Sequence, residues 1–172
     1  MRGGKRSWWP AIAAIATAAA ALAIAAIALN VSRHDQALAE AVDLHVTALA
    51  SANPVDVVST DRHTVKPWFQ GRLPFTFNIP EMQGTGFQLV GGRMAWLQGT
   101  PGAQLLFSMR KHDISVFIFP DSIVAPSAGA QKNAFTVESW REGGLRYLII
   151  GDTGAAEIAS LRRLFEDAAR QR

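Results

Sequence analysis

Cysteine is absent from the 172 residues of this sequence. Disulfide bonds, a thiolate nucleophile and a zinc site with cysteine ligands are therefore excluded. A block of basic residues is also absent, since 17 Lys and Arg are scattered among 14 Asp and Glu, for a formal net charge of +3. A surface that binds nucleic acid usually clusters its basic residues and interleaves them with aromatic ones. We therefore expect no nucleic-acid partner and interpret the charges as ordinary solvated surface.

The motifs of the common enzyme classes are missing too. The sequence has no GxSxG, GxxxxGKS/T or HExxH motif, and its paired glycines are not followed by the helical pattern that a phosphate-binding turn needs. The four histidines are too far apart for local spacing to make a pair of metal ligands. We predict that the protein is not an enzyme and has no catalytic residue, no cofactor and no metal site. The alternative is a metal site that folding assembles from His63, His112 and Asp113.

One long apolar run is present near the N-terminus. Between Arg6 and Asn30 the sequence SWWPAIAAIATAAAALAIAAIAL carries no charge. As an α-helix, residues 8–29 would be about 33 Å long, close to the roughly 30 Å of the hydrocarbon core of a bilayer. Two tryptophans at its start suit the headgroup region, and the basic residues before it favour a cytoplasmic N-terminus. We predict a single-pass protein of the bacterial inner membrane, with a cytoplasmic tail (1–7), a transmembrane helix (8–29) and a periplasmic C-terminal domain.

Two other interpretations of this run are open. Ala26-Ile27-Ala28 resembles the cleavage site of a signal peptide, although the run is longer than the roughly 7 to 15 residues of a typical signal sequence. A buried helix of a soluble core would need apolar cover on every side. An anchor fits the length best, and its many alanines would let a partner helix approach closely in the bilayer.

Residues 30–54 continue the helical pattern, which becomes amphipathic there. Apolar positions recur at three- and four-residue spacing until Asn53-Pro54 ends the pattern. The stripe consists of Leu38, Val42, His45 and Leu49. We expect a juxtamembrane helix that either pairs with a second copy, as a homodimer, or rests against the domain that follows.

The remaining residues, 55–172, predict a small α+β domain with an antiparallel sheet. Short apolar segments separated by glycine-rich turns are typical of antiparallel strands, and we expect about five of them. Segment 121–132 is rich in Ser, Ala, Gly and Pro, which indicates a loop. A helix from about 154 to 169, capped by Asp152 or Thr153, should cover one face of the sheet. Strand-like segments occur at 55–59, 86–97 with a bend at Gly91-Gly92, 103–110, 114–119 as the central strand, 135–140 and 145–150, with turns at 99–102, 111–113 and 141–144.

One segment is a candidate binding surface. In DRHTVKPWF, three basic or titratable side chains come before a Pro-Trp-Phe cluster, a combination that can anchor a partner by apolar burial and cation–π contact. The candidate partner-binding residues are Arg62, His63, Lys66, Trp68 and Phe69. In the alternative interpretation, the two aromatic side chains dock onto the sheet and only hold the segment in place.

Three blocks of the sequence resemble the extracytoplasmic part of a family of proteobacterial transmembrane anti-sigma factors. They are DRHTVKPWFQGRLPF (61–75), GFQLVGGRMAWLQGTPGAQLLF (86–107) and KHDISVFIFP (111–120). The resemblance implies an outer domain that senses a signal or binds a partner, while an inner domain holds an alternative sigma factor until the signal arrives. It implies no catalytic residue.

The sequence departs from that family before the apolar run. The family places a helical sigma-binding domain there, often with a zinc motif of His and Cys, whereas only MRGGKRS precedes the run here. Either an inner domain has been lost from the start of this chain, or the chain is an outer-domain relative that acts through a membrane partner. We predict a membrane-anchored, anti-sigma-factor-like regulator whose protein partner belongs to a sigma-factor system. The alternative is a non-catalytic accessory subunit of a membrane protein complex.

Overall fold

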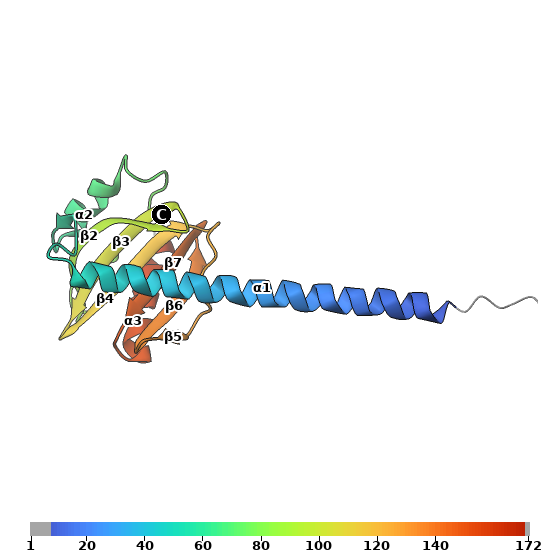
Figure 1. Ribbon diagram of the computed structural model, residues 1–172. Coiled ribbons are helices and arrows are strands. Elements are labelled where there is room, and N and C mark those ends of the chain that lie inside the picture. The colour runs from blue at the N-terminus through green and yellow to red at the C-terminus, as the bar shows by residue number, and fades with distance from the viewer. Residues whose placement is uncertain (1–7, 171–172) are drawn as a thin grey trace, which may run out of the picture. The chain divides into compact units, whose positions relative to one another are not determined.

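The computed structural model describes residues 8–170, which form three helices and seven strands (Figure 1). The chain divides into two compact units with the boundary after Arg33, and each unit is described by itself. The helices are α1 (Trp9–Ala50), α2 (Arg62–Phe69) and α3 (Ala155–Arg170). The strands are β1 (Val57–Val58), β2 (Gln88–Leu97), β3 (Thr100–Met109), β4 (His112–Pro120), β5 (Ala130–Lys132), β6 (Phe135–Glu142) and β7 (Leu145–Gly151).

The first unit contains the N-terminal part of α1. This helix includes one stretch that is long and apolar enough to cross a membrane. Thr17 carries the one hydroxyl between Trp9 and Leu29, and its Oγ1 donates to the carbonyl of Ala14 at 2.9 Å, so the group is satisfied within the helix as a lipid environment requires. A long apolar N-terminal helix is thus confirmed from Trp9 onward, while the expected tail, 1–7, lies outside the described residues. The large apolar side chains exposed on it include Ile12, Ile15, Leu22, Ile24, Ile27 and Leu29.

The second unit is built on a seven-stranded antiparallel sheet with the strand order β1-β2-β3-β4-β7-β6-β5. The predicted α+β class is confirmed, and so is the central position of segment 114–119, which lies in β4. Seven strands replace the expected five or so. The segment expected to be a loop contains β5, whose three residues pair with the start of β6. This strand is formed by pairing with its neighbour, which the Ser- and Gly-rich composition of the segment does not indicate.

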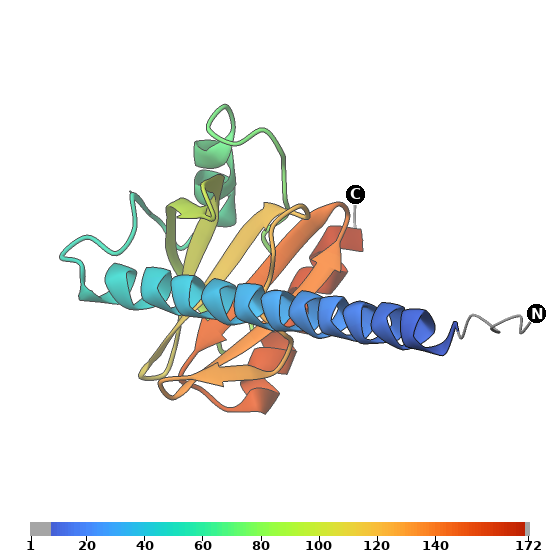
Figure 2. The ribbon, with the colours of Figure 1, turned by 45° about the vertical axis from the view of Figure 1, so that its right-hand side comes forward.

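Helices cover both faces of the sheet, which gives the domain three layers (Figure 2). One face packs against residues 34–50 of α1, and the other packs against α2 and α3. Alternate side chains of β4 therefore enter two different cores, with Val116 and Ile118 on the α3 side and Phe117 on the α1 side. A strand covered on both faces has no solvent side, which explains the continuous apolar run of β4. The expectation that the C-terminal helix covers one face is confirmed.

Residues 34–50 of α1 rest on the sheet through a narrow stripe. The predicted stripe residues Val42 and His45 are fully buried, and Leu38 is half-buried. Leu49 is exposed, which corrects the prediction, because the small Ala48 occupies the contact position three residues after His45. Of the two expectations for this helix, contact with its own domain is therefore observed, and a homodimer would have to use the exposed side of the helix.

The turn between β2 and β3 is tighter than predicted. Leu97 pairs with Thr100, which leaves Gln98 and Gly99 as a two-residue turn. Their φ angles of 54° and 73° are those of the hairpin turn that matches the right-handed twist of strands. The expected turn at 99–102 is therefore corrected, and β3 already includes the proline and glycine of that segment.

The following hairpins show one further correction and one confirmation. The turn between β3 and β4 consists of Arg110 and Lys111, so His112, expected in the turn, is the first residue of β4. The hairpin expected around 141–144 is confirmed, with a pair of glycines at positive φ between β6 and β7. In both hairpins the register places the turn at the two residues between the last paired positions.

The start of α3 also differs from the prediction. The residue before the helix is Gly154, whose carbonyl accepts the backbone N–H of Ile158 at 3.2 Å. Asp152, one of the expected caps, instead places its Oδ1 at 3.0 Å from Nδ1 of His112. The correction has a simple cause, because the sheet brings the first residue of β4 close to the end of β7.

Gly102 in β3 has no room for a side chain. A Cβ atom there would lie 2.2 Å from the Phe119 ring and 2.6 Å from the carbonyl oxygen of Ile118. We expect Gly102→Ala to lower the free energy of unfolding by roughly 1–3 kcal/mol, because overpacking forces the ring and the backbone apart. Thermal unfolding of the full chain in detergent micelles measures this, with Thr100→Ala at the half-buried start of the same strand as the control. Equal stability of both variants would contradict the prediction.

The outer edge of β2 is closed partly by a strand and partly by side chains. β1 pairs with only two residues of β2, Gly91 and Gly92. Further along, the N–H of Met94 donates to Asp56 Oδ2 at 3.3 Å, and the N–H of Gln98 donates to Glu40 Oε1 at 2.8 Å. Carboxylates thus accept backbone donors that have no neighbouring strand.

Candidate functional site

Helix α2 is fixed to the sheet by one side and carries the predicted basic residues on the rest of its surface. Asp61 caps its start, since Oδ1 accepts the backbone N–H of His63 at 2.8 Å. Val65 and Phe69, four residues apart, are buried in the core. This anchoring holds the other helical positions in a defined place beside the segment that follows α2.

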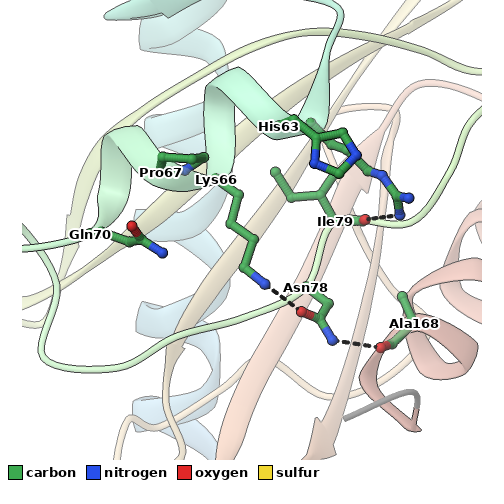
Figure 3. A pocket seen from close by; sticks show the side chains of 8 residues that line it. His63, Lys66, Pro67, Gln70, Asn78, Ile79 and Ala168 are labelled. Atoms are coloured by element: carbon green, nitrogen blue, oxygen red, sulfur yellow. Dashed lines mark hydrogen bonds between the residues drawn. The ribbon is translucent and has the colours of Figure 1, made fainter.

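A cavity of about 410 Å³ lies beside α2 (Figure 3). Its walls come from α2, from the segment that follows it and from the C-terminal end of α3. The predicted residues Arg62, His63 and Lys66 all line it, and no Asp or Glu of the described chain is among the lining residues. The other residues lining it are Pro67, Gln70, Asn78, Ile79 and Ala168. The structure therefore brings the three basic or titratable side chains to one hollow.

Asn78 connects α2 with α3 at this cavity. Its Oδ1 accepts a hydrogen bond from Lys66 Nζ at 2.6 Å, and its Nδ2 donates to the carbonyl of Ala168 at 2.9 Å (Figure 3). That carbonyl belongs to the last turn of α3, where carbonyls lack partners within the helix. The amide thus satisfies a helix end and orients its oxygen toward Lys66. The ammonium group is held by a neutral partner and not by a carboxylate.

Arg62 reaches the segment that follows α2. Its Nη1 donates to the carbonyl of Ile79 at 3.3 Å, and its Nε lies 3.6 Å from Oε2 of Glu81. The Glu81 side chain is 65% exposed, so this ion pair is screened by solvent and contributes little. Arg62 Nε is buried and makes no hydrogen bond within the described part of the chain. Its contact with a charged group is the ion pair with Glu81.

The two aromatic residues of the segment have different surroundings. Phe69 is 2% exposed, and its ring packs edge-on against Phe77 with centroids 5.4 Å apart. Trp68 is half-buried, and the Arg72 guanidinium lies 4.3 Å from its ring centroid. Phe69 therefore belongs to the core, as in the alternative interpretation. The other four predicted residues are exposed or half-buried and can be reached by a partner.

A buried polar cluster joins α1 to the sheet, and the sequence did not predict it. His45 Nδ1 lies 2.7 Å from Ser115 Oγ, which also accepts a hydrogen bond from Gln104 Nε2 at 2.9 Å. Burial lowers the pKa of His45 to about 4, against a smaller opposing effect of the Asp152 charge. The neutral imidazole can accept a hydrogen bond from the Ser115 hydroxyl group, so the three groups form a consistent donor–acceptor chain. Gln104 and Ser115 lie in otherwise apolar stretches and His45 lies on the apolar stripe of the helix, which was the one available sign of a buried polar contact.

This cluster lacks the arrangement of a catalytic pair. A serine nucleophile needs access to substrate and a histidine base that a third group orients. His45 and Ser115 are both fully buried, and His45 Nε2 has no hydrogen-bond partner between residues 8 and 170. We interpret the cluster as a contact that fixes the register of α1 on the sheet.

The described part of the chain does not bring together the ligands of the alternative metal site. Among residues 8–170, no three His, Asp or Glu side chains are placed so that they could hold a metal ion. His112 is engaged with Asp152, and His63 lines the cavity beside α2. The fold therefore places these two histidines in different surroundings.

Comparison with known proteins adds little to this description. Neither a protein-family model nor a curated protein matches the sequence. A solved structure that is similar in part is the crystal structure of MucB in complex with MucA(peri), at 19% sequence identity and a TM-score of 0.35. The match covers 50% of this chain and 34% of that chain. A similarity at this level does not establish a common fold, so the argument on function depends on the residues themselves.

Proposed function

We propose that the chain is a membrane-anchored, non-catalytic regulator of the anti-sigma type, whose folded domain lies in the periplasm and binds a protein partner. The uncharged apolar stretch of α1 supports an anchor, and the basic residues before it favour a cytoplasmic N-terminus. The absence of enzyme motifs from the sequence supports a role in binding and not in catalysis.

The observation that carries this proposal is the spatial arrangement of the blocks that resemble anti-sigma factors. Blocks 61–75, 86–107 and 111–120 supply α2, β2, β3 and β4. These three strands are neighbours in the sheet, and α2 packs in the core that they form. The same blocks supply the basic side chains of the cavity. The resembling sequence thus forms one continuous part of the domain, and that part carries the candidate binding surface.

Purification of the full chain from detergent-solubilised membranes tests the proposal. With a tag at the C-terminus, we expect a protein of a sigma-factor system to be retained in a stoichiometric amount and to be identified by mass spectrometry. Retention of a larger membrane complex without such a protein would contradict the regulatory function and favour an accessory subunit. Retention of no protein at all would contradict both.

A charge reversal tests whether α2 makes the contact. We expect Lys66→Glu to reduce retention of the partner about tenfold or more. A partner that meets a basic surface presents negative charge, which the new carboxylate would repel. Lys111→Glu is the matched control, since this exposed lysine lies in the turn between β3 and β4 and does not line the cavity. Equal retention by both variants would place the contact elsewhere on the domain.

A further inference from the structure

We infer that the cavity beside α2 is a binding site for an oxyanion, that is, a carboxylate or phosphate group presented by a partner or by a small ligand. This inference rests on the proposed function and deepens it, because it names the chemical group that the α2 surface recognises. It is carried by the charges, the free donors and the dimensions of the cavity.

The charge of the cavity is of one sign. Two permanent cations, Arg62 and Lys66, line it together with the titratable His63, and no carboxylate of the described residues lines it. The nearby Glu81 is mostly exposed and contacts Arg62 from 3.6 Å. Walls of low dielectric constant concentrate the field of such charges, so an anion is the species attracted to this hollow.

Donors that the fold does not use point to the same ligand. The Lys66 ammonium has three donor hydrogens, and its one hydrogen bond within the described chain goes to Asn78. The Arg62 guanidinium lines the cavity as well, where Nη1 donates to the carbonyl of Ile79 and Nε is paired with Glu81 at 3.6 Å. The side chains of His63 and Lys66 extend from the same side of α2, toward Ile79 and Asn78 (Figure 3). An oxyanion accepts several such hydrogen bonds at once, and those from charged donors are the strongest.

The end of α3 would repel an anion, and one of its carbonyl groups is already hydrogen-bonded. The C-terminal end of a helix carries a partial negative charge, and α3 ends at this cavity. Asn78 Nδ2 donates to the carbonyl of Ala168 there, so this acceptor of the last turn is already paired. The cavity volume of about 410 Å³ falls within the about 300–1,000 Å³ of small-ligand sites. Pro67 and Ile79 add an apolar wall for a short carbon chain beside the oxyanion.

The test is an NMR titration of the full, ¹⁵N-labelled chain in detergent micelles. Sodium phosphate and sodium acetate are the two probes, each added at constant ionic strength with chloride as the replaced anion. We expect saturable shifts of the backbone amides of residues 62–70 and of the side-chain amide of Asn78, and no saturable shift with chloride alone. A response to both probes indicates a general oxyanion site, whereas a response to one of them identifies whether phosphate or carboxylate is the natural group.

Variants connect the response to the cavity. Lys66→Gln should weaken binding of the probes about tenfold, whereas Lys66→Arg should keep it, because the charge and the donors remain. Lys111→Gln is the matched control and should leave the titration unchanged. If Lys66→Gln does not fold, His63→Gln at an exposed position tests the same cavity and should also weaken binding. Absence of a saturable shift with both probes, or equal binding by Lys66→Gln and the unsubstituted chain, would overturn the inference.

The two proposals fail separately. If the full chain retains its protein partner through Lys66 but binds neither probe, the oxyanion inference is overturned and the proposed function stands. If the chain binds phosphate or acetate in the cavity but retains no partner, the proposed function is overturned and the site stands.

Discussion

Phe69→Ala should lower the free energy of unfolding by roughly 3–5 kcal/mol, the usual loss when a buried phenylalanine is truncated. The ring is 2% exposed, and it fills the space left by Gly92, where an added Cβ would come within 2.8 Å of it. It also packs against Phe77 and lies in the core shared with Val65. Removing it leaves a cavity under α2, so the helix that carries the basic residues should also loosen.

Trp68→Ala is the matched variant and should lower the free energy of unfolding by only roughly 1–2 kcal/mol, as is usual for a side chain that is only partly buried. Trp68 is half-buried at the edge of the core, and one of its contacts is with the Arg72 guanidinium, which lies over its ring. Chemical denaturation of the full chain in micelles, followed by near-ultraviolet circular dichroism, compares the two variants. If Trp68→Ala were the more destabilising change, the assignment of Phe69 to the core and Trp68 to the surface would be wrong.

Acidification should destabilise the domain through His45. Burial holds the pKa of His45 at about 4, below the ordinary value of 6.5 that it has in the unfolded chain. Between those two pH values the unfolded state binds the proton and the folded state does not, so stability falls as the pH falls. The contribution is fully present above about pH 6.5 and is lost by about pH 4, and it amounts to roughly 3 kcal/mol. A protonated Nδ1 could also no longer accept the hydrogen bond that the Ser115 hydroxyl group donates.

The measurement is the free energy of unfolding at a series of pH values, for the unsubstituted chain and for His45→Gln. Protonation of carboxylates in ion pairs also destabilises the folded domain in acid, so the informative quantity is the difference between the two curves. Between pH 6.5 and pH 4, we expect the free energy of unfolding of the unsubstituted chain to fall by about 3 kcal/mol more than that of His45→Gln. His63→Gln, at an exposed position, should keep the steep curve of the unsubstituted chain. A His45→Gln curve parallel to that of the unsubstituted chain would contradict the prediction.

Most of the fold followed from local patterns in the sequence. The apolar run of β4, the paired glycines between β6 and β7 and the amphipathic C-terminal helix each specify an element without reference to distant residues. The features that were not predicted depend on contacts between segments. β5 exists because β6 lies beside it, and the contact of Ala48 in place of Leu49 depends on how α1 turns on the sheet.

The candidate site was predictable only in part. The three basic or titratable residues of segment 61–69 were visible because they precede a Pro-Trp-Phe cluster, and the fold brings all three to one cavity. The role of Asn78 was not visible, since it depends on the end of α3, 90 positions away along the chain. The burial of Phe69 was also undecided, because the spacing of Val65 and Phe69 suits a buried side of α2 only once the sheet is in place. The charged residues of the site thus lie close together in the sequence, whereas the rest of the site depends on contacts between distant segments.

The closed outer edge of β2 bears on how crowded copies of this protein behave. A strand edge with free N–H groups is a template to which another chain can add a strand, and such addition leads to aggregation. A copy approaching β2 would first have to displace the carboxylates of Asp56 and Glu40 from the N–H groups of Met94 and Gln98. At the opposite edge, β5 offers three residues, which is a short template. Many copies can therefore share a small area without joining their sheets, which is the condition that attachment to a bilayer would impose.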